Sequence, residues 1–431
     1  MSYQFLFDLA LILISTKLFG LLTRRFQMPQ VVGALLAGLI FGPACLDVLH
    51  ETDFLSQLAE LGVIVIMFSA GLGTSIRDLK KSGVPGFLVA LCGVIVPLIA
   101  GTAVAWAFTR GQADASFLKN VFIGVILTAT SVSITVETLK ELGKLSTKVG
   151  NIILAAAIID DILGLVALTL VTSLAGADVN IWLVLVKIVL FFAAVVVVGF
   201  LLQKGLNWYA QKKGARNLHR YPVFAFVVCL IFAYCAEEFF GVADIIGAFA
   251  AGLVFAGTTK GDYISAKFQP VQYLFLTPVF FASIGIKVEL PEMSWQLLLL
   301  AVCIVLAAVL SKMIGCGLGA RLCGCTMRES LQTGVGMVCR GEVALIVANK
   351  GLAMGLMPQI FFGPVIIMVV CCAVITPILL KLVFKPRAGE DEYHDLAESA
   401  LADRYDNAEQ LDILSDQLLE ANRKLQSKDK K

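Results

Sequence analysis

The stretch LAAAIIDDILGLVAL, residues 154–168, places two adjacent carboxylates, Asp160 and Asp161, in the middle of a long apolar run. An ionisable side chain in the hydrocarbon region of a membrane costs about 2.5–3.5 kcal/mol on insertion scales, so two of them require a reason. Successive residues of a helix lie about 100° apart, which lets one aspartate face an ion path and the other a neighbouring helix. The alternative is that both aspartates only tie helices together.

The rest of the chain has the composition of a membrane protein. Of its 431 residues, 58% are hydrophobic and only 15% are charged. Soluble domains carry about 45–50% apolar and about 25% charged residues, and so few charges cannot cover a soluble fold of this size. The net charge is only +2, which gives no support to a nucleic-acid partner.

Apolar runs long enough to cross a bilayer follow one another up to Pro386. A spanning helix needs about 20 mostly apolar residues. We count thirteen such runs: 4–22, 29–46, 56–74, 84–109, 117–138, 147–174, 180–202, 221–240, 242–258, 264–286, 294–319, 327–350 and 357–384. The sequence therefore predicts an all-α polytopic membrane protein with about thirteen transmembrane helices over residues 1–385. Residues 386–431 are expected to form a charged, helical, cytoplasmic tail.

The basic residues of the loops predict the orientation of these helices. When the loops are placed alternately on two sides, seventeen basic residues fall on one side and four on the other. The four are Arg110, Lys119, Lys287 and Lys350. The side rich in Lys and Arg is expected to be cytoplasmic. The N-terminus is then outside and the C-terminus inside, in the cytoplasmic (inner) membrane.

Two apolar segments repeat each other at an offset of 214 residues. VVGALLAGLIFG, residues 31–42, matches IIGAFAAGLVFA, residues 245–256. These are spans two and nine, an odd step, so the copies would insert in opposite directions. Inverted repeats of this kind recur in secondary transporters. The alternative is that close helix packing in lipid selects Gly and Ala in any case.

Three further charged residues lie inside apolar runs. Lys312, in AAVLSKMIGCG, needs a buried counter-ion, for which one of the two aspartates is the candidate. Arg340 and Glu342 flank Gly341 in GMVCRGEVALIV. Glycines weaken a helix, and irregular backbone at membrane depth is tolerated only where it lines a cavity or is buried in protein.

Span five has a corresponding polar interruption, TATSVSITV, residues 128–136. Hydroxyls and freed carbonyls, including those of Thr130 and Ser131, are suitable ligands for an alkali cation, and half-helix ends add partial charges. Ser/Thr hydrogen bonds between helices are the alternative interpretation. Two broken helices that meet near a pair of carboxylates predict an ion site that can be exposed alternately to either side.

Other chemistry finds little support in the sequence. Most of the 11 cysteines lie in apolar runs, where a thiol behaves as a small hydrophobe, and the 3 histidines fall in loops or the tail. Neither a nucleophile–base constellation nor a phosphate-binding loop is evident, so we expect no cofactor and no enzymatic activity.

At TATSVSITV, AAAIIDDILGL, SKMIGCGLGA and CRGEVALIV, in this order, the sequence closely resembles the bacterial monovalent cation:proton antiporters. The resemblance is strongest to the NapA-type sodium/proton exchangers of the second antiporter family, and it covers residues 1–385. It implies a homodimer whose protomers have a dimerisation domain (spans one to three and eight to ten) and a core domain (spans four to six and eleven to thirteen). Span seven connects the two, and two broken helices cross in the core.

The resemblance also implies roles for individual residues. Asp161 is similar to the cation-binding carboxylate, and Asp160 to its partner, which pairs with Lys312. Thr130 and Ser131 resemble ligands or near-ligands. Arg340 and Glu342 resemble groups that stabilise the crossing or tune the response to pH. The implied activity is exchange of Na⁺ or Li⁺ for H⁺ across the lipid bilayer by alternating access, electrogenic if Lys312 also releases a proton.

Three alternatives stay open. Potassium/proton antiport is the main one, because oxygen ligands do not reveal the size of the cavity. A gated cation channel would need a continuous pore, against which the charged residues at mid-membrane depth argue. A sodium-coupled symporter of organic anions could share crossed helices but would need a larger cavity.

Overall fold

The computed structural model describes residues 3–25, 28–110, 116–174, 181–213, 220–258, 260–288 and 294–385. Every regular element within these ranges is a helix, as the apolar runs predicted. Ten helices are long and apolar enough to cross a membrane, and shorter apolar helices cover Gln30–Phe41, Asp244–Ala256 and Val343–Ala353. The multi-pass helical fold is confirmed, whereas the count of thirteen spans stays a prediction.

One set of helices, which we term the core group, packs around a shared apolar interior. It comprises α5 (Gly83–Thr109), α6 (Phe117–Thr128), α7 (Val132–Glu141), α8 (Lys148–Leu174), α14 (Trp295–Leu322), α15 (Met327–Gly336), α16 (Glu342–Ala353) and α17 (Phe362–Phe384). Its interior includes Phe122, Ile304, Val347 and Met368, which come from four different helices. α5 packs along α6, α8 and α14, so it holds this group together.

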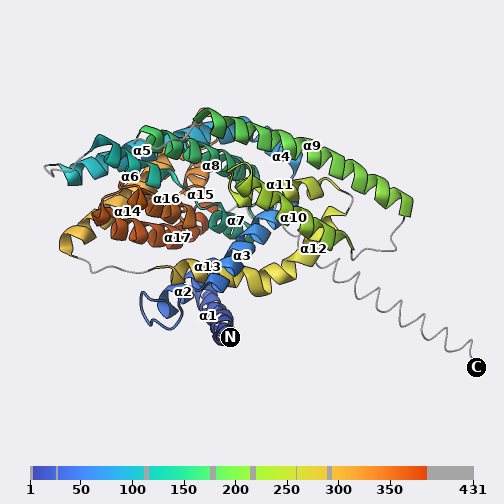
Figure 1. Ribbon diagram of the computed structural model, residues 1–431, viewed down its shortest axis with the longest axis horizontal. Helices are drawn as coiled ribbons and strands as arrows, with labels where there is room; N and C mark the ends of the chain where they lie inside the picture. The colour runs from blue at the N-terminus through green and yellow to red at the C-terminus, as the bar shows by residue number, and fades with distance from the viewer. Residues whose placement is uncertain are drawn as a thin grey trace, which may run out of the picture. The chain divides into compact units, whose positions relative to one another are not determined.

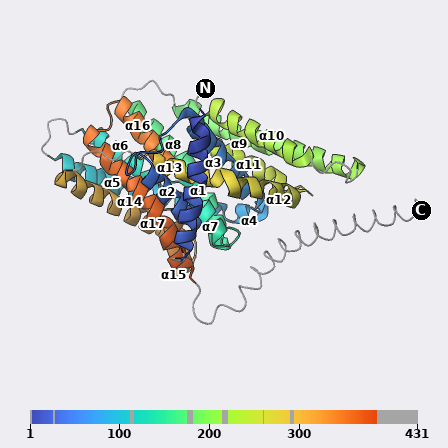
Figure 2. The same cartoon turned by 90° about the horizontal axis from the view of Figure 1, so that it is seen from below.

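A second set, the flanking group, has an apolar cluster of its own around Ile12, Leu55 and Val279. It comprises α1 (Gln4–Arg25), α2 (Gln30–Phe41), α3 (Asp53–Leu72), α10 (Arg220–Glu238), α11 (Asp244–Ala256), α12 (Gly261–Val271), the π-helix η1 (Gln272–Leu276) and α13 (Thr277–Ile286). α9 (Ile181–Lys213) packs on α8 of one group and α11 of the other. In both Figure 1 and Figure 2, α5, α6 and α14 lie together, away from α10, α11 and α12. The flanking group consists of the helices expected for the dimerisation domain, and that role stays a prediction.

Three predicted spans differ from the observed helices. α2 ends at Phe41, before Gly42 and Pro43, although the apolar run continues to residue 46. α9 extends to Lys213 because polar residues such as Gln203 and Lys204 continue a helix beyond its apolar part. The span predicted over 264–286 contains a π-helix, because Pro278 cannot donate a hydrogen bond to the preceding turn. Two short helices, α4 (Ile76–Lys81) and η2 (Gln359–Phe361), lie in connections, and the predicted tail helix lies outside the described residues.

The repeated segments make equivalent close contacts. Gly71 of α3 faces Gly252 of α11, where a Cβ added to either would lie 2.9 Å from the Cα of the other. Gly285 of α13 faces Gly38 of α2, where an added Cβ would lie 2.7 Å from the Gly38 carbonyl carbon. The offset of 214 relates Gly38 to Gly252 and Gly71 to Gly285. The two contacts are therefore the same contact made twice with the repeats exchanged.

Candidate functional site

Two broken helices meet inside the core group. Residues 129–131 separate α6 from α7, and residues 337–341 separate α15 from α16. The two extended segments are joined where the Ser131 amide donates to the Cys339 carbonyl at 3.0 Å. A Cβ added to Gly341 would lie 2.6 Å from the Ser131 Oγ, so this close approach requires glycine. The two interruptions predicted from the sequence are confirmed, and they contact each other.

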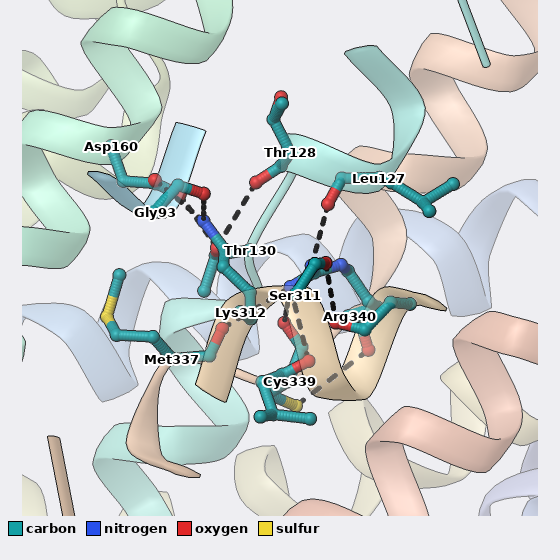
Figure 3. Close-up of polar contacts among 12 residues, drawn as sticks. Gly93, Leu127, Thr128, Thr130, Asp160, Ser311, Lys312, Met337, Cys339 and Arg340 are labelled. Atoms are coloured by element: carbon teal, nitrogen blue, oxygen red, sulfur yellow. Dashed lines mark hydrogen bonds and ion pairs between the residues drawn. The ribbon is translucent and has the colours of Figure 1, made fainter. Parts of the chain in front are cut away.

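Arg340 connects these interruptions through main-chain carbonyls. Its side chain is fully buried. Nη2 donates to the Leu127 carbonyl near the end of α6 at 2.6 Å. Nη1 lies 3.2–3.3 Å from the carbonyls of Met337, Val338 and Cys339, which follow α15. Helix C-termini carry partial negative charge, so one guanidinium stabilises the ends of both half-helices (Figure 3).

An ion pair lies beside this crossing. Lys312 of α14 donates to Asp160 Oδ1 of α8 at 2.7 Å, and the two side chains are 0% and 1% exposed. Lys312 Nζ also donates to the Gly93 carbonyl of α5 at 2.8 Å. Thr130, in the break of the first helix, donates to the other carboxylate oxygen, Asp160 Oδ2, at 2.7 Å (Figure 3). The pair expected from the sequence is thus present, with both carboxylate oxygens occupied.

The position of Gly93 permits this arrangement. A Cβ added there would lie 2.5 Å from Cys316 Sγ and 3.5 Å from Lys312 Nζ. α5 and α14 can therefore approach closely enough for the Gly93 carbonyl to accept from the ammonium. Breaking a buried pair costs about 3–5 kcal/mol, since it leaves an uncompensated charge. The hydrogen bond from Lys312 to the Gly93 carbonyl adds to the cost of moving the lysine.

Asp161 lies on a cavity rather than in the ion pair. The cavity has a volume of about 280 Å³ and its wall includes Asp161, Asp160, Thr128 and Ala129 from the core group, and Glu237 from the flanking group. Carboxylate and hydroxyl oxygens are the donors that a hard cation such as Na⁺ takes in proteins. The cavity therefore offers a place where such a cation can contact Asp161.

A second cavity, of about 370 Å³, adjoins the first and shares Glu237, Ala243, Val343 and Ile346 with it. Its wall adds two acidic residues, Glu60 and Asp244, and one lysine, Lys287, while Lys350 lines the first cavity. Acidic residues outnumber lysines in both walls, and clefts in which one sign of charge predominates concentrate ions of the opposite sign. The two cavities together form a path of acidic character between the groups of helices that leads to Asp161.

The remaining predicted site residues lie at or near the crossing. Ser131 is fully buried, and its Oγ shares a 3.2 Å hydrogen bond with Ser133 Oγ. Glu342 begins α16, and its side chain lies outside the described part of the structure. The structure thus brings Asp160, Lys312 and Thr130 into direct contact and places Asp161 on the cavity. Whether Thr130 and Ser131 contact a transported cation stays a prediction.

Two residues of the site were not identified from the sequence. Gly93 is one of 37 glycines, and its role depends on its carbonyl, which no sequence pattern marks. Glu237 ends an apolar run, where a carboxylate is ordinary. The adjacent pair Glu237 and Glu238 was the feature of the sequence that could have marked this position as part of the site.

Comparison with known proteins identifies the family. Residues 10–385 match the family described as "Sodium/hydrogen exchanger, transmembrane". The chain belongs to this family. It is 40% identical to the Na⁺/H⁺-K⁺ antiporter GerN of Bacillus cereus over 89% of this chain and 97% of that relative. It is 34% identical to an Na⁺/H⁺ antiporter of Enterococcus hirae over 88% of this chain and 97% of that relative.

A solved structure of the same fold supports this membership. The sodium proton antiporter MjNhaP1 of Methanocaldococcus jannaschii matches with a TM-score of 0.67 at 18% identity, over 90% of this chain and 100% of that chain. The family is one of transporters, and the expected antiporter resemblance is confirmed at this level. Its NapA-type subdivision stays a prediction.

Proposed function

We propose that this sodium/hydrogen exchanger moves Na⁺ or Li⁺ in exchange for H⁺ at Asp161. Cation/proton antiport as such follows from the family and the fold. The observation that carries the site assignment is the position of Asp161 on a cavity, next to the buried Asp160–Lys312 pair at the crossing of two broken helices. The path to it is lined by Glu237 and Glu60.

Exchange follows from competition at one carboxylate. A proton neutralises the carboxylate of Asp161, whereas a bound cation stabilises its ionised form. The proton-bound and cation-bound forms therefore exclude each other. A ligand that binds one exposed state and is released from the other drives transport by shifting the equilibrium between states.

Lys312 supplies the second proton in this proposal. When a cation enters, Asp160 turns one oxygen toward it and loosens its contact with Lys312, whose ammonium then releases a proton. Two protons would move per sodium ion, and transport would be electrogenic. The Gly93 carbonyl holds the amine in place while its charge changes.

The test is cation-dependent proton movement in proteoliposomes, titrated separately with Na⁺, Li⁺ and K⁺. Wild type should exchange Na⁺ or Li⁺ for H⁺, and Asp161→Asn should abolish exchange. Asp262→Asn, a matched change at an exposed residue of α12, should retain it. Full activity of Asp161→Asn would reject the site. A rate that is insensitive to membrane potential would reject the electrogenic step.

Potassium is a second candidate substrate. The observation in its favour is that the relative GerN is named as an Na⁺/H⁺-K⁺ antiporter at 40% identity. The same titration separates the two, because exchange with K⁺ alone would keep the mechanism and change the cargo.

The surroundings of the protein complete the proposal. We place the chain in the cytoplasmic membrane as a homodimer, with the N-terminus outside, the C-terminus inside, residues 1–385 as the transport domain and 386–431 as a cytoplasmic tail. The flanking group would form the dimer contact. Measuring the mass of the protein in detergent tests the homodimer. Protease access to the tail in sealed vesicles of known orientation tests the cytoplasmic position of the C-terminus.

A further inference from the structure

α7 packs against the flanking group, and none of its residues lines the two cavities described above. It contacts α2 and α3. The helix that precedes it across the break, α6, contributes Val125 and Thr128 to the wall of the cavity that contains Asp161. α6 and α7 are two parts of one interrupted span. Two further cavities, of about 380 Å³ and 150 Å³, lie against Glu137 and Glu141 of α7, and the residues that line them do not include Asp161. Among these cavities, the one that reaches Asp161 lies along α6 and not along α7.

Polar side chains join the groups at the end of α7. Gln272 of η1 donates through Nε2 to Glu137 Oε2 at 3.1 Å and accepts through Oε1 from Lys140 Nζ at 3.1 Å. Glu137 and Gln272 are 8% and 2% exposed, so the contact between carboxylate and amide is buried. One glutamine of the flanking group thus binds an acid and a base of the core group.

Glu141 makes a further contact one turn later. The main-chain amide of Gln30 donates to Glu141 Oε2 at 2.8 Å. Gln30 begins α2, whose N-cap, Pro29, makes no side-chain capping hydrogen bond. A carboxylate at a helix N-terminus satisfies a main-chain donor and complements the helix dipole. The flanking helix α2 is therefore capped by the core group.

The π-helix η1 begins at Gln272. Such wide turns inside α-helices occur frequently at functional sites. Pro270 precedes this turn and Pro278 follows it, so two residues of this span lack the amide hydrogen of a regular helix. The glutamine that holds α7 therefore lies at an irregular turn of its span.

We propose that Glu137, Lys140 and Glu141 of α7, together with Gln30 and Gln272, form a gate, the α7 gate, that closes the ion path on this side and separates once in each transport cycle. The proposal rests on the exchange function proposed above. Alternating access requires the cavity on the α6 side to close and the α7 side to open. The hydrogen bonds of the gate are then lost and regained in every cycle, and they favour the state in which the α6 side is open.

Cross-linking tests whether the gate must separate. A Glu137→Cys/Gln272→Cys protein would be treated with a short bifunctional thiol reagent that a reductant cleaves, then assayed in proteoliposomes. We expect exchange before treatment, at least a tenfold loss after it, and recovery on reduction. Wild type treated in the same way corrects for the native cysteines. If the cross-linked protein exchanged as fast as the same protein after reduction of the cross-link, the proposal would be overturned.

The matched control joins two helices of one group. Thr109 and Asn120 share a 3.1 Å hydrogen bond between α5 and α6. A cross-link in Thr109→Cys/Asn120→Cys should leave the exchange rate unchanged. A wild-type protein without exchange would count against the proposed function instead, so the two failures are distinguishable.

A second measurement does not depend on transport. Ala243 lines both cavities, so an Ala243→Cys protein reports through its labelling rate, followed by mass spectrometry at that position, how often the α6 side is open. Adding Gln272→Ala should lower this rate at least twofold, because it removes two hydrogen bonds that hold the open state. Gln332→Ala removes a partly buried hydrogen bond within the core group, from Gln332 Nε2 to the Val383 carbonyl, and should not change the labelling rate. Equal rates in all three proteins would overturn the proposal.

Discussion

Arg340 shows how a single side chain can hold a helix crossing together. Its guanidinium is buried among four carbonyls from two separate half-helices. The planar fork of arginine reaches both sets at once, which the single nitrogen of lysine cannot do. The arrangement makes Arg340 primarily a structural residue of the site, whereas Asp161 faces the cavity.

Replacing Arg340 should therefore lower stability in two steps. Arg340→Lys keeps the charge but loses one set of carbonyls. Arg340→Ala removes the guanidinium from all four carbonyls, of which the Cys339 carbonyl keeps the Ser131 amide as a donor. Each charged hydrogen bond that is lost costs about 1.5–3 kcal/mol. Thermal unfolding of the purified protein should rank wild type above Arg340→Lys and Arg340→Lys above Arg340→Ala. Arg321→Ala, which removes one hydrogen bond to Cys325 at the end of α14, is the control and should cost less. Equal melting temperatures for the two alanine variants would contradict this role.

Gly93 should be sensitive for a different reason. Gly93→Ala would displace Cys316 Sγ, because the added Cβ would lie 2.5 Å from the sulfur. Overpacking of this kind costs about 1–3 kcal/mol. Cys316→Ala removes the sulfur, so the double variant should recover most of the stability lost by Gly93→Ala. Additive effects in thermal unfolding would show that the two positions do not compete for the same space.

The two broken helices begin differently, although they occupy equivalent places. α15 starts with a capping box, in which the Thr326 hydroxyl accepts from the Glu329 amide at 3.2 Å and Glu329 Oε2 accepts from the Thr326 amide at 2.7 Å. Lys148 of α8 also pairs with Glu329 at 2.9 Å. The N-cap of α6, Ser116, makes no side-chain capping bond. α15 is thus fixed at its start by its own sequence, and α6 relies on packing.

This difference predicts unequal effects of one substitution. Thr326→Ala should destabilise the protein by about 1 kcal/mol, the usual cost of a lost N-cap, and should raise hydrogen exchange in the first turn of α15. Ser116→Ala, at the corresponding helix start, should change stability by less than half as much. Unfolding and peptide-resolved hydrogen exchange of both variants measure the difference. A larger effect at Ser116 would contradict the capping argument.

Across the whole molecule, the repeats interlock through pairs of glycines. Gly71 meets Gly252, and Gly38 meets Gly285, so each repeat supplies one glycine to each contact. Small residues let helix backbones approach closely in a membrane, where van der Waals packing replaces the hydrophobic effect as the driving force. The two contacts fix the flanking group as a unit made from both repeats.

Equivalent glycines should then be equally sensitive. Gly71→Ala and Gly285→Ala should each lower stability by about 1–3 kcal/mol through overpacking, and by similar amounts. Gly164→Ala in α8 is the control, since an added Cβ there meets no other atom within 4 Å. Melting temperatures of the three variants give the comparison. A strong effect at one glycine and none at its equivalent would show that the repeat does not extend to packing.

Much of this protein could be predicted because charge and apolar sequence contrast so strongly in a membrane. Asp160, Asp161 and Lys312 stand out as charged residues within apolar runs, and the polar residues around Thr130 and the glycines around Arg340 mark the breaks. Gly93 and Gln272 could not be identified in this way. A main-chain carbonyl and a single side-chain amide cannot be recognised in the sequence as part of a site, because their role depends on a partner from another helix.

The sequence by itself determined the membrane class, the helical runs, the repeated segments and the buried charges, because each of these depends on residues that are neighbours in the chain. Only the tertiary structure decided that Lys312 pairs with Asp160 while Asp161 faces a cavity. The same holds for the carbonyls that Arg340 satisfies and for the contacts of Gln272 with α7. The physical reason is that adjacent aspartates have the same local sequence environment. Which one is paired depends on the direction in which each side chain leaves α8 and on which helix lies there.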